Sequence, residues 1–222
     1  MSDQVDKITL VCTTLGKNPD LLQRMLKSAV SRFETFDQII IHTDAKEILV
    51  ITTDGTRYHI PALIHFTIPE AYNFIIEKMV KTQWVCCMCD DDYFYPEGLE
   101  KMIAEVHKGI DADVAHFKFH VSGYIPPEDK RCWFGKKEYD LWERGNVVKE
   151  LLKGHNRIPA ASFFRKQTFE MVGGFKGDKC HDQDLWTRMA KAGIEFKYFE
   201  HKVYNYVRRD NSAWVQQNSK KN

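Results

Sequence analysis

The feature that most constrains the fold of this chain is an apolar run followed directly by three aspartates. Residues 83–89 are almost all apolar and β-prone, which is typical of a strand buried on both faces of a sheet. Asp90–Asp92 follow at once, and Pro96 then favours the start of a helix over Glu97–His107. The aspartates therefore belong to a tight strand-to-helix loop at the carboxyl end of a strand, where α/β sheets have their active sites.

The three aspartates indicate a bound cation. Adjacent carboxylates repel one another unless something offsets their charge. In an extended backbone, Asp90 and Asp92 point to one side and Asp91 to the other. A hard divalent cation such as Mn²⁺ or Mg²⁺ would offset this charge, so we predict that Asp90 and Asp92 are metal ligands. The alternative is a solvated acidic turn with capping roles.

Two earlier strands are expected to bring polar side chains to the same edge. Residues 8–12 and 36–42 are predicted strands, separated by an amphipathic helix from Asp20 to about Phe33. Strand, helix and strand of this length favour parallel strands, whose carboxyl ends meet at one edge of the sheet. The polar residues after these strands that we place beside the aspartates are Thr13, Thr14 and Asp44.

The rest of the chain alternates between further strands and helices. Asp54-Gly55 predicts a β-hairpin between residues 47–53 and 56–60, inserted at the sheet edge. Pro69 opens a helix that runs to about Lys81. The aromatic-rich residues 122–154 are either loops lining an acceptor pocket or ordinary core. The remaining predicted elements are a half-exposed strand at 112–120, further strands at 158–164 and 195–207, and helices at 143–153, 166–172 and 182–193.

Composition favours one globular domain over residues 1–215, with a disordered tail at 216–222. The chain has 222 residues, 43% of them hydrophobic, which is enough for a sizeable core. Its net charge of +1 provides no global field that would recruit nucleic acid or an anionic membrane. Residues 1–7 lack the pattern of a signal peptide and no run is long enough to span a membrane, so we expect a cytoplasmic protein with reduced, buried cysteines.

Taken together, these segments resemble the small inverting glycosyltransferases of family 2. Ile39–Asp44 resembles that family's second strand with its nucleotide-contacting Asp, and Cys89–Asp92 resembles its DXD motif. Gly173-Gly174-Phe175, followed by His181–Trp186, resembles its GGF and ED segment. The resemblance runs from about Ile8 to Ser212. It implies an α/β protein with the GT-A fold, in which helices flank a mixed, mainly parallel central sheet that carries the inserted hairpin.

The resemblance also implies roles for the candidate residues. Asp182 would be the general base that takes the proton from an acceptor hydroxyl, although an N-cap role at its helix start is an equal alternative. A Mn²⁺ or Mg²⁺ on Asp90 and Asp92 would screen the leaving diphosphate. The residues implied in nucleotide binding are Thr13, Thr14, Asp44, Asn73, Asp90, Asp91 and Arg208. Further candidates are His181 and His201 for the metal, Asp184 as a second base, and Arg209 and Ser212 in a closing C-terminal segment.

Two residues depart from the family pattern. Tyr72 precedes Asn73 where the family usually has Arg, and His181 replaces the Glu before the catalytic Asp. Transfer of one sugar from a nucleoside-diphosphate donor, a UDP-sugar, to a hydroxyl is the leading hypothesis. The acceptor is a glycan, a protein, a small molecule or a hydroxymethylated base in DNA. The alternatives are an idle GT-A domain that binds nucleotide or glycan, and a metal-dependent nucleotidyltransferase. The sequence does not indicate an oligomeric state.

Overall fold

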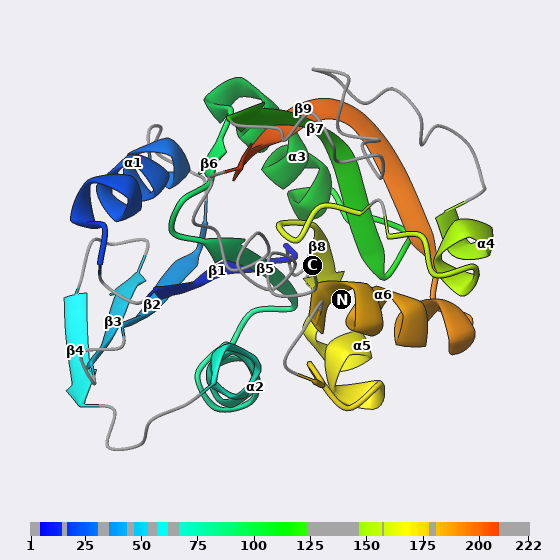
Figure 1. The fold of residues 1–222 in the computed structure, drawn as a ribbon, viewed down its shortest axis with the longest axis horizontal. Coiled ribbons are helices and arrows are strands. Elements are labelled where there is room, and N and C mark those ends of the chain that lie inside the picture. Colours follow the sequence, from blue (N-terminus) through cyan, green and yellow to red (C-terminus); the bar gives the residue numbers. More distant parts are fainter. Residues whose placement is uncertain are drawn as a thin grey trace, which may run out of the picture.

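The computed structural model describes residues 5–14, 17–30, 36–43, 47–52, 57–61, 67–123, 147–156, 158–177 and 181–208. Within these residues, one nine-stranded sheet has the strand order β4-β3-β2-β1-β5-β8-β7-β9-β6 (Figure 1). The strands are β1 Ile8–Thr14, β2 Gln38–Thr43, β3 Glu47–Thr52, β4 Arg57–Pro61, β5 Trp84–Cys89, β6 Tyr93–Phe94, β7 Val114–Gly123, β8 Phe163–Arg165 and β9 Phe196–Arg208. The helices are α1 Pro19–Ala29, α2 Ile68–Lys78, α3 Pro96–His107, α4 Val147–Leu152, α5 Lys166–Met171 and α6 His181–Lys191.

The sheet is mixed, as predicted. β1 pairs in parallel with both β2 and β5, and β7 pairs in parallel with β9. The other pairs among the described strands are antiparallel, including β5 with β8 and β8 with β7. Antiparallel pairing is therefore more extensive than the sequence indicated. Because β8 reverses direction between them, β5, β7 and β9 all run the same way and end at the same edge.

Helices cover both faces of the sheet. One core contains buried residues of α1 and α3, such as Met25 and Leu99, packed against β1 and β5. The other contains buried residues of α2, α5 and α6, such as Ile75 and Trp186, packed against the opposite face. Burial of each such large apolar side chain contributes about 1.5–3 kcal/mol. The sheet is thereby held as a rigid layer whose carboxyl edge carries the polar residues.

β5 is the central strand that its sequence predicts. Trp84, Cys86 and Met88 point into the core on one face. Val85 and Cys87 point into the core on the other. An unbroken apolar run is required here, because alternate residues of the strand are buried on opposite sides. The cysteines Cys12, Cys86 and Cys87 are free and buried, as expected, whereas Cys89 at the end of β5 is exposed.

The local predictions are mostly confirmed. β3 and β4 form the antiparallel hairpin at the sheet edge, although its turn at Asp54-Gly55 lies outside the described residues. α3 begins at Pro96 and ends at His107 as predicted. α2 ends at Lys78, three residues before the predicted end at Lys81. α1 ends at Ala29, and most of its predicted extension to Phe33 is not described.

Three predictions on the second half of the sheet were wrong. The strand expected at 158–164 is reduced to β8, because Pro159 has no N–H to pair and its carbonyl instead accepts from the Ser162 N–H at 3.0 Å, forming a turn. β7, expected to be half exposed, is buried on both faces over residues 114–117, because Ala115 and Phe117 pack into one core and Val114 into the other. β6 was assigned to a loop, since two residues are too few for a strand pattern.

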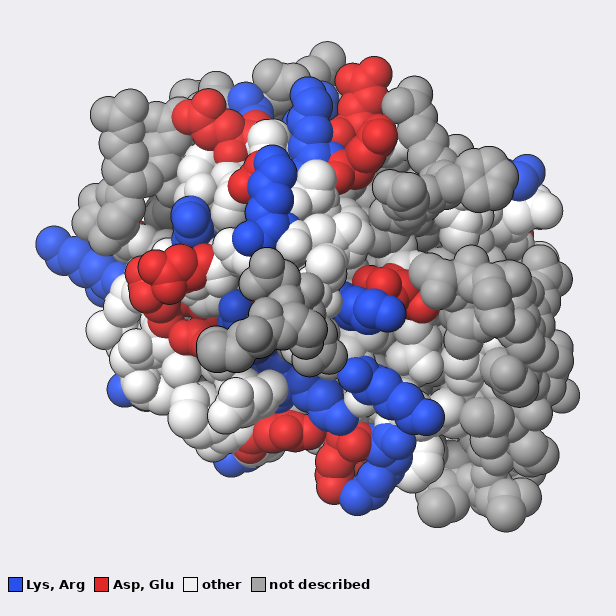
Figure 2. All heavy atoms as spheres, turned by 180° about the vertical axis from the view of Figure 1, so that it is seen from behind, with Lys and Arg blue, Asp and Glu red and all other residues white. Residues whose placement is uncertain are grey.

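Charges are dispersed over the surface. On the face seen in Figure 2, basic and acidic side chains of the described residues are intermixed. This agrees with the small net charge of +1 for the whole chain. Among the described residues, none of the helices is long and apolar enough to cross a membrane.

Candidate active site at the carboxyl edge of the sheet

The ends of β1, β2 and β5 lie side by side. Thr13 on β1 is opposite Cys89 on β5, and Thr14 is opposite Thr43 on β2. The Thr14 hydroxyl donates a hydrogen bond to the carboxylate of Asp90. The parallel arrangement thus brings together Thr13, Thr14 and the aspartates, as expected. Asp44 follows the end of β2 but lies outside the described residues.

Residues 90–92, which we call the acidic turn, do not continue the strand. β5 ends at Cys89, and Asp90 and Asp91 form a turn. The prediction that Asp90 and Asp92 point one way and Asp91 the other assumed an extended backbone and does not apply. The turn is supported by α1, since the Arg24 guanidinium donates to the Asp91 carbonyl oxygen at 2.5 Å.

Asp92 is the buried member of the acidic turn. Only 1% of its surface is exposed. One carboxylate oxygen accepts from the Tyr204 hydroxyl, and the other accepts from the Val207 backbone N–H at 2.7 Å. Burial raises the pKa of Asp92 well above its ordinary value, and the charge of Asp91 adds to this, while the two hydrogen bonds act in the opposite direction. Asp92 therefore connects the acidic turn to the end of β9.

The acidic turn offers ligands for a cation. Ligand atoms of Cys89, Asp91 and Asp92 lie within 4.8 Å of one another. Carboxylate oxygens suit hard cations such as Mg²⁺ and Mn²⁺, whereas a thiolate suits softer ones. Two carboxylates and an exposed thiol at the end of one strand thus fit a divalent cation. This group differs from the predicted pair, since it includes Asp91 and Asp92 while Asp90 is hydrogen-bonded to Thr14.

The second turn of α2 connects two parts of the site. The Tyr72 hydroxyl donates to the Met88 carbonyl oxygen on β5 at 3.1 Å. The Asn73 amide makes two hydrogen bonds with the backbone of Phe175: its Nδ2 donates to the carbonyl oxygen at 2.9 Å, and its Oδ1 accepts from the N–H at 2.8 Å. Asn73 thus holds a residue of the Gly-Gly-Phe segment, and its contact with the nucleotide stays a prediction.

Asp182 lies in the first turn of α6. The helix already includes His181, so Asp182 is a helical residue and not the N-cap. Its Oδ2 accepts from Asn156 Nδ2 at 3.2 Å. The His181 ring packs edge-on against Phe175, with centroids 5.4 Å apart, and lies 6.4 Å from the Tyr72 ring. The start of α6 therefore lies next to Tyr72, which itself contacts the end of β5.

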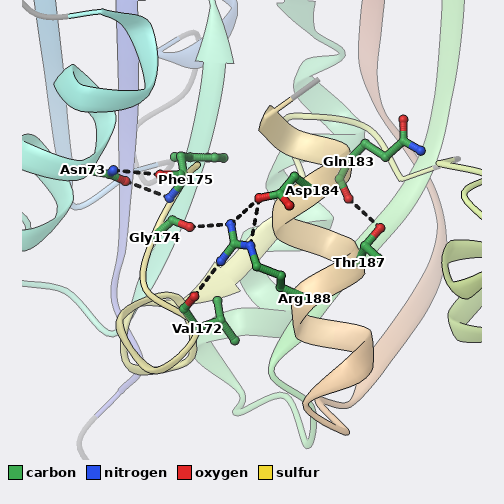
Figure 3. Close-up of polar contacts among 8 residues, drawn as sticks. All are labelled: Asn73, Val172, Gly174, Phe175, Gln183, Asp184, Thr187 and Arg188. Carbon is green, nitrogen blue, oxygen red and sulfur yellow. Dashed lines mark hydrogen bonds and ion pairs between the residues drawn. The ribbon is translucent and has the colours of Figure 1, made fainter. Parts of the chain in front are cut away.

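Asp184 is engaged in an ion pair. Its Oδ2 accepts from Arg188 Nε at 2.8 Å and lies 2.7 Å from Arg188 Nη2 (Figure 3). The two residues are four apart on α6, so they lie on the same face of the helix. In this structure, Asp184 is thus paired with Arg188 of its own helix.

The other candidates lie on or beyond β9. His201 is half-buried, its ring stacks on Phe199 with centroids 6.3 Å apart, and it is not part of the metal-ligand group found among the described residues. His201 falls where β9 shifts its register against β7, since Phe117 pairs with Phe199 but Lys118 with Lys202. Arg208 is the last residue of β9, and its side chain is not described. Arg209, Ser212 and the tail at 216–222 lie outside the described residues, as does most of the aromatic stretch.

Several residues of the site were missed by the sequence analysis. Tyr204 was assigned only to a strand, and Arg24 only to an amphipathic helix. No sequence signal marks either one, because each contacts the acidic turn across a long sequence separation. Arg188 had a usable signal, since a basic residue four positions after Asp184 on a helix favours an ion pair.

A hollow of about 480 Å³ lies against the same region. Its lining residues are Asn73, Glu77, Phe169, Glu170, Gly173 and Gly174. None of the acidic turn lines it, so we assign the chemistry to the strand ends and not to this hollow.

Comparison with known proteins gives a family match that includes β1, β2, α2 and the acidic turn and ends before α6. The family model of glycosyl transferase family 2 matches residues 9–173. A comparison with curated proteins gives no match. Among solved structures, S. aureus TarS 1–349 covers 90% of this chain at 11% identity with a TM-score of 0.58. TarS 1–349 in complex with UDP-GlcNAc covers 93% of this chain at 11% identity with a TM-score of 0.55. Its complex with UDP covers 92% at 12% identity with a TM-score of 0.53. This chain spans about 60% of the length of those TarS chains. The likeness shows a shared fold.

Proposed function

Because this chain belongs to glycosyl transferase family 2, we propose that it transfers one sugar from a UDP-sugar to an acceptor hydroxyl, with inversion at the anomeric carbon. One observation carries this proposal: two acidic segments distant in sequence meet across Tyr72. Its hydroxyl contacts Met88, directly before the end of β5, and its ring lies beside His181, directly before Asp182. The group proposed to bind a cation and the group proposed to accept a proton would thus lie on either side of one side chain.

The donor assignment rests on the strand ends and on the fold. Thr13 and Thr14 on β1 and Asp90 after β5 form a polar edge next to the acidic turn. We assign this edge, with Asp44, to the base and ribose of the nucleotide. The similar TarS structures were determined with UDP-GlcNAc and with UDP, which supports a uridine nucleotide.

A divalent cation, Mn²⁺ or Mg²⁺, would be held by the carboxylates of the acidic turn and would stabilise charge on the leaving diphosphate. Asp92 would be a ligand, together with Asp91 or Asp90. The Tyr204 hydroxyl and the Val207 N–H hold Asp92 in one orientation. Since Val207 directly precedes Arg208, we assign Arg208 to the phosphates of the donor, which a guanidinium would suit.

Asp182 is the proposed general base. An acceptor hydroxyl is a poor nucleophile until its proton is removed, and a positioned carboxylate can remove it. Asn156 donates to Oδ2 of Asp182 and orients the carboxylate. The second oxygen, Oδ1, would accept the proton as the hydroxyl attacks the anomeric carbon. The acceptor hydroxyl belongs to a glycan, a protein, a small molecule or a hydroxymethylated DNA base.

A thermal-shift screen tests donor and metal. UDP, GDP, CDP and ADP are each added with Mn²⁺ or with chelator, because a ligand that binds the folded state raises its melting temperature. We expect UDP with Mn²⁺ to give the largest shift and chelator to remove most of it. Asp92→Ala should lose the metal-dependent shift, whereas Asp111→Ala, in an exposed turn before β7, should keep it. Equal shifts with and without metal would contradict the metal role.

An assay of products tests the reaction. Incubation with UDP-GlcNAc and Mn²⁺ should release UDP, with water as the acceptor when no other is present. Release of pyrophosphate from UTP in the presence of N-acetylglucosamine 1-phosphate, without release of UDP from UDP-GlcNAc, would identify a nucleotidyltransferase. UDP binding with no turnover, tested with glycan, peptide and hydroxymethylated DNA acceptors, would identify an idle binding domain.

A further inference from the structure

We infer that Arg188 is a positioning residue for the transfer reaction: it holds residues 172–175, which we call the glycine loop, against α6 and so fixes Asp182 relative to the acidic turn. This inference rests on the proposed function, because it assigns Asp182 the role of base. Arg188 itself touches none of the proposed reacting groups among the described contacts.

The guanidinium of Arg188 uses each of its nitrogens on the glycine loop or on α6. Nη1 donates to the Val172 carbonyl oxygen at 2.6 Å, and Nη2 donates to the Gly174 carbonyl oxygen at 2.5 Å. Nε donates to Asp184 at 2.8 Å. Figure 3 shows the guanidinium between the loop and the helix. Since only 19% of the side chain is exposed, these contacts are largely shielded from water.

Asn73 holds the glycine loop from the other side. Its two hydrogen bonds to the Phe175 backbone join the loop to α2, as Figure 3 also shows. Gly174 allows this close approach: its φ is +68°, and a Cβ atom there would lie 2.6 Å from Asn73 Oδ1. The loop is therefore fixed between two helices by side chains that pair with its backbone.

The glycine loop transmits this constraint to the site through Phe175. The Phe175 ring packs against Tyr72 at 5.4 Å and against His181 at 5.4 Å between centroids. Tyr72 contacts the end of β5, and His181 precedes Asp182. A shift of the loop would therefore change the separation between the acidic turn and the base, and a misplacement of about 1 Å can cost about a hundredfold in rate.

Lysine cannot replace this arginine. A guanidinium is a planar fork with five N–H donors, whereas an ammonium is a compact charge on a flexible stem. Arg188→Lys would keep the charge next to Asp184 but would not reach both carbonyl oxygens and the carboxylate at once. The substitution thus distinguishes the effect of the positive charge from the effect of the planar guanidinium geometry.

Steady-state kinetics with UDP-GlcNAc and Mn²⁺ test the inference. We expect Arg188→Lys to lower kcat for UDP release about tenfold or more, with KM for UDP-GlcNAc changed by no more than about twofold, because the donor contacts lie elsewhere. Asp184→Asn, a milder change, should lower kcat in the same direction. A raised KM with unchanged kcat, or wild-type kcat in both variants, overturns the inference.

Arg165 supplies a matched control. It also donates to two backbone carbonyl oxygens, those of Ala112 and Ile110, and pairs with Asp6, but it lies beside Trp84 at the opposite end of β5. We expect Arg165→Lys to lower the melting temperature at least as much as Arg188→Lys while leaving kcat unchanged. If kcat falls equally in both variants, the role of Arg188 is structural only.

Amide hydrogen exchange keeps this test separate from that of the proposed function. The Gly174 N–H donates to the Phe169 carbonyl oxygen and the Phe175 N–H donates to Asn73, so both amides report on the loop. We expect both to exchange faster in Arg188→Lys but not in Arg165→Lys. If the wild-type protein releases no UDP, the proposed function fails, and the exchange rates alone decide whether Arg188 holds the glycine loop. Unchanged exchange at both amides in Arg188→Lys would show that it does not.

Discussion

The hydroxyl of Tyr204 donates a hydrogen bond to the buried carboxylate of Asp92, although 112 residues separate the two in the sequence. Both side chains are almost fully buried, at 2% and 1% exposure. A buried carboxylate without partners is strongly unfavourable, so this bond and the one from Val207 make the position of Asp92 possible. The acidic turn and β9 consequently depend on each other.

Removal of this hydroxyl should destabilise the protein. Tyr204→Phe keeps the ring but leaves one carboxylate oxygen of Asp92 without its donor, which costs about 1–3 kcal/mol. Mn²⁺-dependent binding of UDP should weaken as well, because Asp92 is less firmly held. Urea denaturation and calorimetry measure the two effects. Tyr93→Phe, which keeps the ring 4.9 Å from the Arg24 guanidinium, is the control and should be close to neutral.

Loss of the base should affect turnover and not donor binding. Asp182→Asn keeps the size of the side chain and an oxygen that can accept from Asn156. It cannot take up a proton, so we expect kcat to fall about 10²–10⁴-fold while the affinity for UDP with Mn²⁺ stays the same. Stopped assays of UDP release and calorimetry measure these quantities. A rate near that of the wild type would place the base elsewhere.

The glycine loop provides a pair of matched glycine substitutions. Gly174→Ala combines a positive φ of +68° with a contact of 2.6 Å to Asn73, whereas Gly177→Ala has a φ of +75° and nothing within 4 Å. The backbone strain, about 1–2 kcal/mol, is common to both. We therefore expect Gly174→Ala to be the more destabilising by about 1 kcal/mol or more, as for other overpacked sites. Equal unfolding free energies of the two variants would show that the Asn73 side chain moves aside without a loss of stability.

His116 should make stability depend on pH. Burial lowers the pKa of His116 from 6.5 to about 4. Between pH 6.5 and pH 4, His116 is therefore protonated in the unfolded chain but not in the folded protein. The free energy of unfolding should fall by about 3 kcal/mol as the pH drops through this range. His116→Phe keeps a ring next to Tyr198 and removes the titration. The difference in unfolding free energy between wild type and variant should thus change across this range; parallel curves would contradict the prediction.

Local pattern was sufficient for much of the fold. The run at 83–89 identifies β5, because only a strand covered on both faces needs every residue apolar. Pro96 and Asp54-Gly55 locate a helix start and a hairpin, because both act through the dihedral angles of one or two residues. Strand, helix and strand of the observed lengths favour parallel pairing, which brings the strand ends to one edge, so Thr14 was correctly placed next to Asp90.

The partners of these residues were decided only by the tertiary structure. The pairing of Asn73 with Phe175, 102 residues away, was not expected. Burial of Asp92 under the end of β9 was not expected, and β8 keeps only Phe163 and Phe164 of a longer predicted strand. Periodicity and turn chemistry depend on neighbours in sequence, whereas these contacts depend on which strands pair and in which register. That choice is made by the burial of the whole sheet between two layers of helices, which no single segment encodes.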